Sequence, residues 1–159
     1  MVGWSDLPAD LSDTAKIARV SAALPAGVPI ISSDLIRTIA TADALATGRD
    51  RLSHDPDLRE MHFGAWEQRA FAEIEAEDPE RIAAFWFDLT ARVNRAVDRL
   101  LALERPLVVV AHFGVILTQI ERVTGISTEE AFGHWIEPLS ITTLRYGATP
   151  EAVQINHEP

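Results

Sequence analysis

The residue with the clearest chemical setting is His112, which ends a short apolar run. Residues 107–111 read Leu-Val-Val-Val-Ala after Pro106, and a helical pattern begins immediately after the histidine. A short β-branched run of this kind predicts a strand buried on both faces, which is typical of a parallel sheet covered by helices. Ligands bind at the carboxyl ends of such strands, and the N–H groups that open the next helix attract anions. We therefore expect the imidazole of His112 to face a phosphate or a carboxylate.

Arg37 is a second candidate for anion binding. It falls in the first turns of a helix predicted from Asp34 to about Ala46, with Ser33 as the N-cap. A cation is unfavourable at the positive end of the helix dipole unless a negative group lies nearby. A bound anion would satisfy that requirement. Position alone leaves open a simpler interpretation, in which Arg37 points into water or pairs with Asp34.

Glu60 is the candidate for acid–base chemistry. It lies in residues 54–66, which have no hydrophobic period and are predicted as a long loop, among apolar and aromatic neighbours. Loss of water around a carboxyl group raises its pKa, so the group can hold a proton near neutral pH and act as a general acid. The alternative is a salt bridge between Glu60 and Arg59 or another surface cation. The role of His62 in the same loop is equally open.

The remaining candidate ligands do not form a metal site. The five histidines show no paired spacing on one predicted helix, and the chain contains no cysteine. The lack of cysteine also excludes disulfides and thiol chemistry, and it fits a reducing compartment. We expect neither a metal nor a cofactor, and a cytoplasmic location.

The elements that must position these residues alternate between strands and helices. This order predicts an α/β fold built from packed layers. The predicted helices cover a segment capped by Ser12, then residues 34–46, 67–78, 79–86, 89–104 and 113–123, with a further turn capped by Ser127. The predicted strands cover residues 28–32, 107–111, 139–146 and 153–155.

Composition limits the classes of function. A chain of 159 residues with 47% hydrophobic and 24% charged residues fits one globular domain over residues 1–159. Its longest apolar stretches are far shorter than the roughly 20 residues of a membrane span, and it shows no export signal. The net charge of −10 argues against nucleic-acid binding, which depends on Lys and Arg at the phosphates. The sequence leaves a homodimer open.

Four segments, in order along the chain, resemble motifs of the histidine phosphatase superfamily, which has a phosphoglycerate mutase-like fold. Each motif alone is modest, whereas four in order are specific. The segments are residues 3–8, Gly-Trp-Ser-Asp-Leu-Pro; 32–42, Ser-Ser-Asp-Leu-Ile-Arg-Thr-Ile-Ala-Thr-Ala; 58–67, Leu-Arg-Glu-Met-His-Phe-Gly-Ala-Trp-Glu; and 111–116, Ala-His-Phe-Gly-Val-Ile. The third looks closest to α-ribazole phosphatase-like members.

The resemblance implies a fold and a set of roles. The fold is a three-layer α/β sandwich with a mostly parallel central sheet flanked by helices. The chemistry is phosphoryl transfer from a small phosphorylated metabolite to a histidine and then to water. Carried over to this sequence, Arg37 is a phosphate ligand, His112 is a second histidine that contacts the phosphoryl oxygens, and Glu60 is the proton donor.

Two parts of the family's pattern are missing. The nucleophilic histidine of the family lies in an Arg-His-Gly motif at the end of a first, central strand, just before the Gly-Trp loop, whereas this sequence reads Met-Val-Gly-Trp from residue 1. A loop that relatives place before a segment like residues 88–93 is also shortened near residues 86–89. We therefore expect residues 1–159 to be part of a longer protein that contains the first strand, and to be inactive on their own.

Three hypotheses for function follow. The first is phosphomonoester hydrolysis through a phosphohistidine intermediate in the complete protein. The second is a non-catalytic relative that binds a phosphorylated ligand or a partner protein through Arg37 and His112, since the nucleophile is absent. The third, a plain structural α/β domain, treats the four ordered motifs as accidental.

Overall fold

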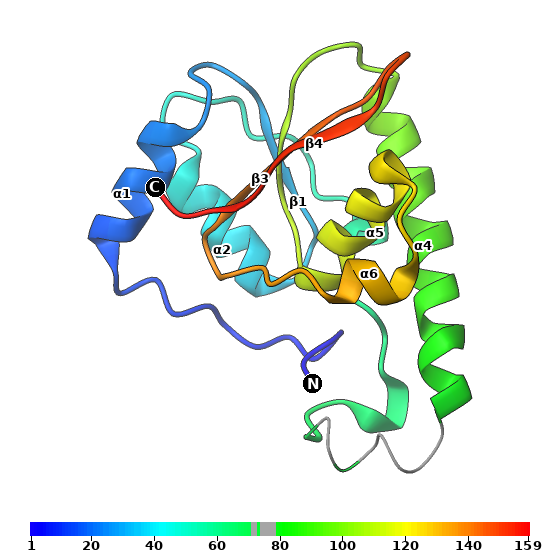
Figure 1. The fold of residues 1–159 in the computed structure, drawn as a ribbon. Helices are drawn as coiled ribbons and strands as arrows, with labels where there is room; N and C mark the ends of the chain where they lie inside the picture. The colour runs from blue at the N-terminus through cyan, green and yellow to red at the C-terminus, as the bar shows by residue number, and fades with distance from the viewer. Residues whose placement is uncertain (71–72, 74–78) are drawn as a thin grey trace.

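The computed structural model describes residues 1–70, 73 and 79–159, and it has the α/β fold expected from the sequence (Figure 1). Most of the predicted helix 67–78 lies outside the described residues. The helices are α1 Thr14–Ala23, α2 Ile36–Leu45, α4 Pro79–Leu101, α5 Phe113–Thr124 and α6 Thr128–Phe132, with short 3₁₀ helices η1 Pro56–Leu58 and η2 Gly64–Trp66. The strands are β1 Ile30–Ser32, β2 Val108–Val110, β3 Ile141–Arg145 and β4 Glu151–His157.

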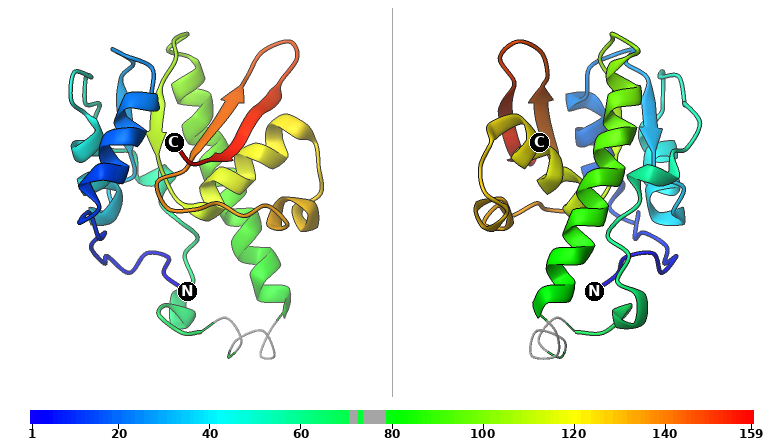
Figure 2. Two further views of the ribbon diagram at one scale, coloured as in Figure 1. Left: turned by 60° about the vertical axis from the view of Figure 1, so that its left-hand side comes forward. Right: turned by 90° about the vertical axis from the view of Figure 1, so that its right-hand side faces the viewer.

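The described strands form two small sheets. Strand β1 pairs in parallel with β2, with Ile31 opposite Val109, and β3 pairs antiparallel with β4. Helices α1 and α2 lie on one side of the molecule and α4 on the other, while the β3–β4 hairpin lies against α5 (Figures 1 and 2). The described residues therefore show one parallel and one antiparallel pair, where the resemblance implies a mostly parallel central sheet.

The prediction that residues 107–111 are buried on both faces is wrong. Val109 is 41% exposed, and Val108 and Val110 are only partly buried. Among the described residues, β2 pairs with a strand only along its β1 edge. A strand covered on one side keeps part of its surface in contact with solvent, which an apolar sequence run cannot reveal.

Helix α4 is continuous over 23 residues, where the sequence analysis predicts two helices that end and begin near residues 86–89. No glycine or proline interrupts it after Pro79, which is well tolerated in a first helical turn. Leu89, Val93 and Ala96 are all fully buried, so they form the apolar stripe that packs against α5. This stripe makes α4 a rigid support for the loop that contains η1 and Glu60, which contacts α4.

Helix capping agrees with the sequence at one helix and differs at two. The Ser127 cap is confirmed: its hydroxyl accepts the N–H of Glu130, whose carboxylate accepts the N–H of Ser127. Helix α1 is capped by Asp13 instead of Ser12. Helix α2 starts at Ile36 and has no side-chain cap from Ser33. The N–H of Ile36 donates to Asp6 Oδ1 at 2.7 Å, and the hydroxyl of Ser33 lies 2.6 Å from Thr38 Oγ1.

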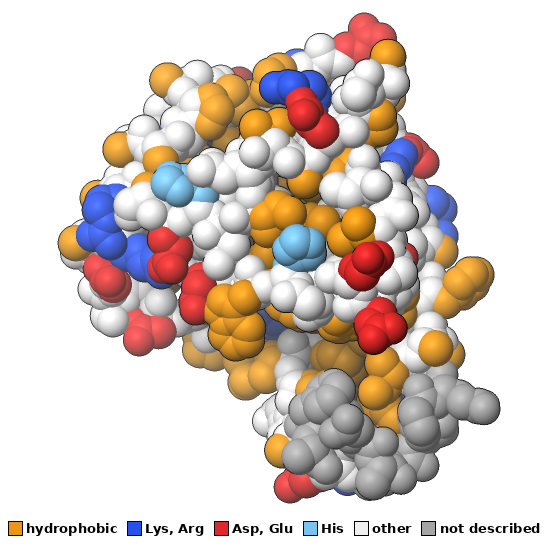
Figure 3. Space-filling model, in the orientation of Figure 1, with side chains coloured by type: hydrophobic (Ala, Val, Ile, Leu, Met, Phe, Trp, Pro, Cys, Tyr) orange, Lys and Arg blue, Asp and Glu red, His pale blue; other side chains and the backbone are white. Residues whose placement is uncertain are grey.

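On the face shown in Figure 3, hydrophobic and uncharged side chains gather near the centre, and most charged side chains lie toward the edges.

No helix within the described residues is long and apolar enough to cross a membrane.

Candidate active site

His112 is the N-cap residue of α5 and lies between two partners from the β1–α2 region. Its Nε2 is 2.8 Å from Ser33 Oγ, and Arg37 Nε donates to its Nδ1 at 3.3 Å. Because Nδ1 accepts a hydrogen bond, the ring proton lies on Nε2 and is donated to Ser33. Burial, with the nearby charges of Arg37 and Arg92, lowers the pKa of His112 to about 3. The imidazole is therefore neutral at neutral pH.

Arg37 donates to His112 through Nε, and its other donors bind backbone oxygens. Nη1 donates to the carbonyl of Ser5 at 2.9 Å, and Nη2 donates to the carbonyl of Gly3 at 2.6 Å. The simpler interpretation, a pair between Arg37 and Asp34, is wrong because Asp34 receives two hydrogen bonds of 2.6 Å from Arg59. Arg37 is thus a half-buried cation that donates to neutral acceptors, while the carboxyl groups of Glu60, Asp6 and Glu67 lie near enough to act on its charge.

The carboxyl group of Glu60 is buried at the N-terminus of α5. Its Oε1 accepts the N–H of Met61 at 2.8 Å, and its Oε2 accepts the N–H of Gly114 at 3.0 Å. The helix N–H group expected to attract an external anion is therefore occupied by this carboxylate. Burial raises the pKa of Glu60, although the two N–H donors and the charges of Arg37 and Arg92 oppose that rise. The structure does not show the alternative pair with Arg59: both carboxyl oxygens of Glu60 accept backbone N–H groups, and Arg59 pairs with Asp34.

Gly114 contacts Glu60 and Ser33 contacts His112, and neither has a role in the site predicted from the sequence. A methyl group on Gly114 would clash with Glu60 Oε1 and lie 2.9 Å from Leu89 Cδ2, so only glycine lets the carboxylate approach α5. Ser33 Oγ lies 2.6 Å from Thr38 Oγ1 as well as near His112. Both residues fall inside the quoted motifs, which is the signal that could have identified them.

Arg92 is a third such residue, and it fixes the loop that carries Glu60. From α4 its guanidinium donates to the backbone carbonyls of Asp57 and Arg59 at 2.8 Å each and of Glu60 at 3.0 Å. The sequence does offer a signal for Arg92: it is a charged residue next to the apolar stripe that contains Leu89 and Val93. Arg92 is therefore a positioning residue for the loop segment that carries Glu60.

Glu67 joins residues 3–5 to the same loop. Its carboxylate accepts the backbone N–H groups of Gly3, Trp4, Ser5 and Phe63 at 2.8 to 3.1 Å, and also the hydroxyl of Ser5 at 2.8 Å. Burial alone would raise the pKa of Glu67, but these donors hold it at about 2. Glu67 thus keeps the carbonyls of Gly3 and Ser5 beside Arg37.

We expect Glu67→Gln to flatten the acid dependence of stability. A carboxyl whose pKa is lowered in the folded state stabilises the fold above its ordinary pKa and loses that contribution as the pH falls, here between about pH 4.5 and pH 2. Urea unfolding at pH 7, 4 and 3 should show a steeper loss of unfolding free energy in the parent protein than in the variant. Parallel curves would show that Glu67 does not stabilise the fold through its charge.

His62 and His54 have partners other than Arg37 and His112. The ring of His62 packs against Trp4 with centroids 4.5 Å apart, and His54 Nδ1 lies near Ser32 and Arg51. Within the part of the chain that the structure describes, no second imidazole hydrogen-bonds Arg37 or His112, and no cluster of three potential metal ligands occurs.

Comparison with known proteins places this geometry in context. The family model of the histidine phosphatase superfamily (branch 1) matches residues 2–157. The adenosylcobalamin/α-ribazole phosphatase of Salmonella typhimurium is 34% identical over 111 residues, which cover 59% of this chain and 55% of that protein. The glucosyl-3-phosphoglycerate phosphatase of Mycolicibacterium vanbaalenii is 32% identical over 151 residues, covering 77% of this chain and 67% of that protein. The match thus spans little more than half the length of the Salmonella relative.

Solved structures show the same fold. Bacillus stearothermophilus YhfR superposes with a TM-score of 0.81 at 21% identity, covering 99% of this chain and 88% of that one. The α-ribazole phosphatase from Shigella flexneri superposes with a TM-score of 0.77 at 19% identity, again covering 99% and 88% of the two chains.

Proposed function

The chain belongs to the histidine phosphatase superfamily, and we propose that the complete protein hydrolyses phosphomonoesters of small metabolites. The observation that carries this proposal is the convergence of Arg37, His112 and Glu60 at the N-terminus of α5. A cation, a neutral imidazole and a buried carboxyl are the groups that a phosphoryl site needs for binding and for proton transfer. The named phosphatases among the relatives support the same reaction class.

Phosphate binding at this site requires Arg37 to exchange partners. Its two terminal nitrogens now donate to the neutral carbonyls of Gly3 and Ser5. Hydrogen bonds from a guanidinium to a phosphate are stronger than those to a neutral carbonyl, so the exchange favours the anion. We propose that the phosphoryl oxygens then lie between Arg37 and His112. For this, the imidazole proton moves from Nε2 to Nδ1, so that the hydroxyl of Ser33 donates to Nε2 and the Nδ1–H, released by Arg37, donates to a phosphoryl oxygen.

The proposed reaction has two steps. A histidine nucleophile attacks phosphorus and the bond to the leaving oxygen breaks, while Glu60 donates its proton to that oxygen. Glu60, now ionised, takes a proton from water, which attacks the phosphohistidine and releases inorganic phosphate. The raised pKa of Glu60 supports the first role because it keeps the carboxyl protonated to higher pH.

We propose that the nucleophile stands on a further parallel strand between β2 and β3 in the complete protein, which would join the two small sheets into one. One observation supports this place. The β2 edge opposite β1 has no strand partner among the described residues, so its backbone N–H and C=O groups are available to a further strand.

The second candidate function is a binding module for phosphorylated ligands. It is favoured by one observation: none of the described histidines other than His112 contacts Arg37. Loss of a covalent nucleophile costs several orders of magnitude in rate, so such a protein would bind phosphate without turnover.

One assay separates the two candidates. We expect protein expressed from the full upstream reading frame to hydrolyse p-nitrophenyl phosphate, and residues 1–159 alone to show negligible turnover. If neither form hydrolyses the ester but both bind vanadate by calorimetry, the binding module is correct. If neither form turns over substrate or binds vanadate or phosphate, both candidates are wrong.

A further inference from the structure

A chain of buried hydroxyl groups leads from His112 back to the first turn of α2. Ser33 Oγ lies 2.8 Å from His112 Nε2 and 2.6 Å from Thr38 Oγ1. Thr38 Oγ1 in turn lies 2.9 Å from the carbonyl oxygen of Leu35 and 3.2 Å from that of Ser33. Ser33 is 0% exposed and Thr38 is 3% exposed, so both hydroxyls are shielded from solvent. Each hydroxyl must therefore find its hydrogen-bond partners within the protein.

The protonation of His112 fixes the direction of every hydrogen bond in this chain. Arg37 Nε donates to Nδ1, so the ring proton lies on Nε2 and is donated to Ser33 Oγ. The hydroxyl proton of Ser33 then goes to Thr38 Oγ1, and the hydroxyl proton of Thr38 goes to a backbone carbonyl. In the structure the chain therefore donates from the imidazole toward the backbone.

The opposite direction satisfies the same groups. With the ring proton on Nδ1, the hydroxyl of Ser33 donates to Nε2, and the hydroxyl of Thr38 donates to Ser33 Oγ across the same 2.6 Å. The carbonyl oxygen of Leu35 then loses the hydroxyl of Thr38, but it still accepts the backbone N–H groups of Thr38 and Ile39 at 3.0 Å each. The reversal thus leaves no hydroxyl proton of the chain without an acceptor, which is the costly case for a buried group.

We propose that Thr38, which does not touch the imidazole, acts through Ser33 to set which ring nitrogen of His112 carries the proton. In the free protein the chain holds the proton on Nε2, and it reverses when phosphate binds. This assignment rests on the proposed function, which requires a proton on Nδ1 to meet a phosphoryl oxygen. The imidazole carries one proton before and after the exchange: water takes the proton from Nε2 and supplies the proton to Nδ1, while the two hydroxyl groups rotate and keep their protons. Ser33 and Thr38 are thus positioning residues.

The ¹⁵N resonances of His112 test the reversal directly, because they distinguish a protonated from an unprotonated ring nitrogen. The protein from the full reading frame is measured at pH 7, and the signals of His112 are assigned by their loss in His112→Asn. We expect Nε2 to be protonated without ligand and Nδ1 to be protonated at saturating inorganic phosphate. An Nε2 that keeps its proton at saturating phosphate, alone or together with a proton on Nδ1, would overturn the reversal and leave the phosphate site intact. If inorganic phosphate does not bind, the phosphate site is wrong and the reversal falls with it.

Thr38→Val tests the part of Thr38, because valine keeps the shape of the side chain and removes its hydroxyl. The hydroxyl of Ser33 then loses Thr38 Oγ1 as its acceptor and must donate to Nε2, so we expect a shift of the proton of His112 toward Nδ1 even without phosphate. Thr38→Ser keeps the hydroxyl and should restore the signals of the parent protein. Thr41→Val is the matched control on the same helix, since the hydroxyl of Thr41 donates to the backbone carbonyl of Arg37 at 2.7 Å.

The variants separate a positioning role from a packing role. Folded Thr38→Val with the proton of His112 still on Nε2 would make Thr38 a packing residue and overturn its assignment. An equal shift in Thr38→Val and Thr41→Val would do the same, because it would reflect a general disturbance of α2. If Thr38→Val does not fold, the comparison of the parent protein with and without phosphate still decides whether the chain reverses.

Discussion

Glu60→Gln is expected to lower the turnover of an alkyl phosphomonoester such as glycerol phosphate by about 10²- to 10⁴-fold, because it removes the proton donor to a poor leaving group. p-Nitrophenolate leaves readily without a proton, so hydrolysis of p-nitrophenyl phosphate should fall much less. The comparison of kcat for the two esters, in protein from the full reading frame, separates a lost acid from a distorted site. An equal fall for both esters would contradict the role of Glu60 as the acid.

The pH profile gives a second measurement of the same role. The burial of Glu60 raises its pKa, so the protonated carboxyl persists to higher pH and turnover of the alkyl ester should decline as the pH rises through that pKa. In Glu60→Gln this alkaline decline should disappear. An unchanged profile would assign the decline to another group.

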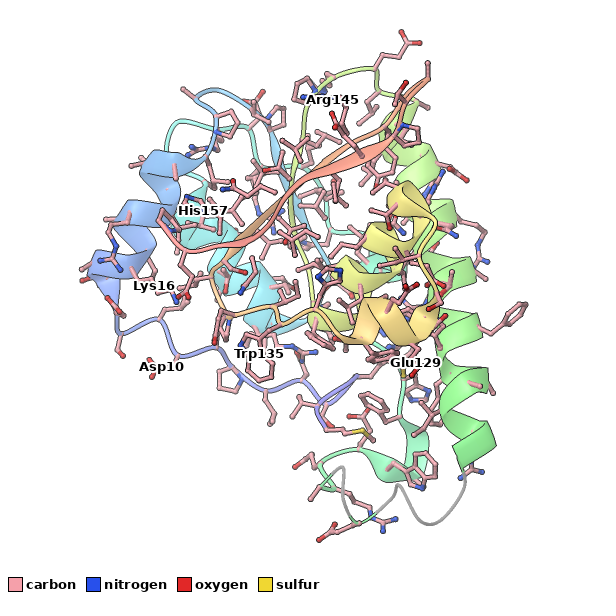
Figure 4. All side chains as sticks on the ribbon, in the orientation of Figure 1. Asp10, Lys16, Glu129, Trp135, Arg145 and His157 are labelled. Atoms are coloured by element: carbon pink, nitrogen blue, oxygen red, sulfur yellow. The ribbon has the colours of Figure 1, made fainter. Side chains whose placement is uncertain are left out.

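The variant also needs a stability control. Glutamine places an NH₂ group against one of the two N–H donors that now bind the carboxylate, Met61 or Gly114, at a cost of about 1 kcal/mol. Thermal unfolding will show whether the fold survives that cost. Glu129→Gln, at an exposed residue of α6, is the matched carboxylate control and should leave turnover unchanged (Figure 4).

Arg37→Ala is expected to weaken binding of vanadate or phosphate by about 10- to 100-fold, whichever candidate function is correct. The expected loss corresponds to about 1.5 to 3 kcal/mol for hydrogen bonds to a charged group. The phosphate affinity of Arg37→Lys should lie between those of the parent protein and Arg37→Ala, since lysine keeps the charge but loses the planar set of donors. Calorimetry of the three proteins measures the difference directly, and unchanged affinity in Arg37→Ala would remove this residue from the site.

Two controls make the Arg37 result specific. Arg145→Ala removes an exposed cation at the end of β3, toward the tip of the hairpin, and should not alter phosphate affinity (Figure 4). Arg37→Ala also removes the donors to Gly3 and Ser5, so circular dichroism and thermal unfolding must accompany it. A variant that unfolds at the assay temperature would leave Arg37→Lys as the informative comparison.

The site shows how far local sequence signals reach. The junction of the apolar strand with α5 at His112 can be predicted because it depends on neighbouring residues. The same is true of the Ser127 capping box and of the apolar stripe of α4. The motif positions of Arg37 and Glu60 are also evident from the sequence. What each side chain binds is not.

Three differences between prediction and structure share one cause. The sequence predicts that Ser33 caps a helix from Asp34, but the hydroxyl of Ser33 lies near His112, which is 79 positions away. Asp6 instead binds the first N–H of α2 from 30 positions upstream. The sequence predicts that the N–H groups of α5 are open to an external anion, but Glu60, 54 positions before Gly114, occupies one of them. Each competing partner comes from a distant segment.

The sequence by itself therefore determined the order of strands and helices and the family of the chain, since periodicity, caps and motifs act over a few residues. Only the tertiary structure decided that the three site residues meet at one helix N-terminus, that Arg37 donates to the carbonyls of Gly3 and Ser5, and that the hydroxyl of Ser33 lies between Thr38 and His112. Buried polar groups must find partners wherever the fold brings donors and acceptors together, and that choice depends on packing between segments far apart in the chain.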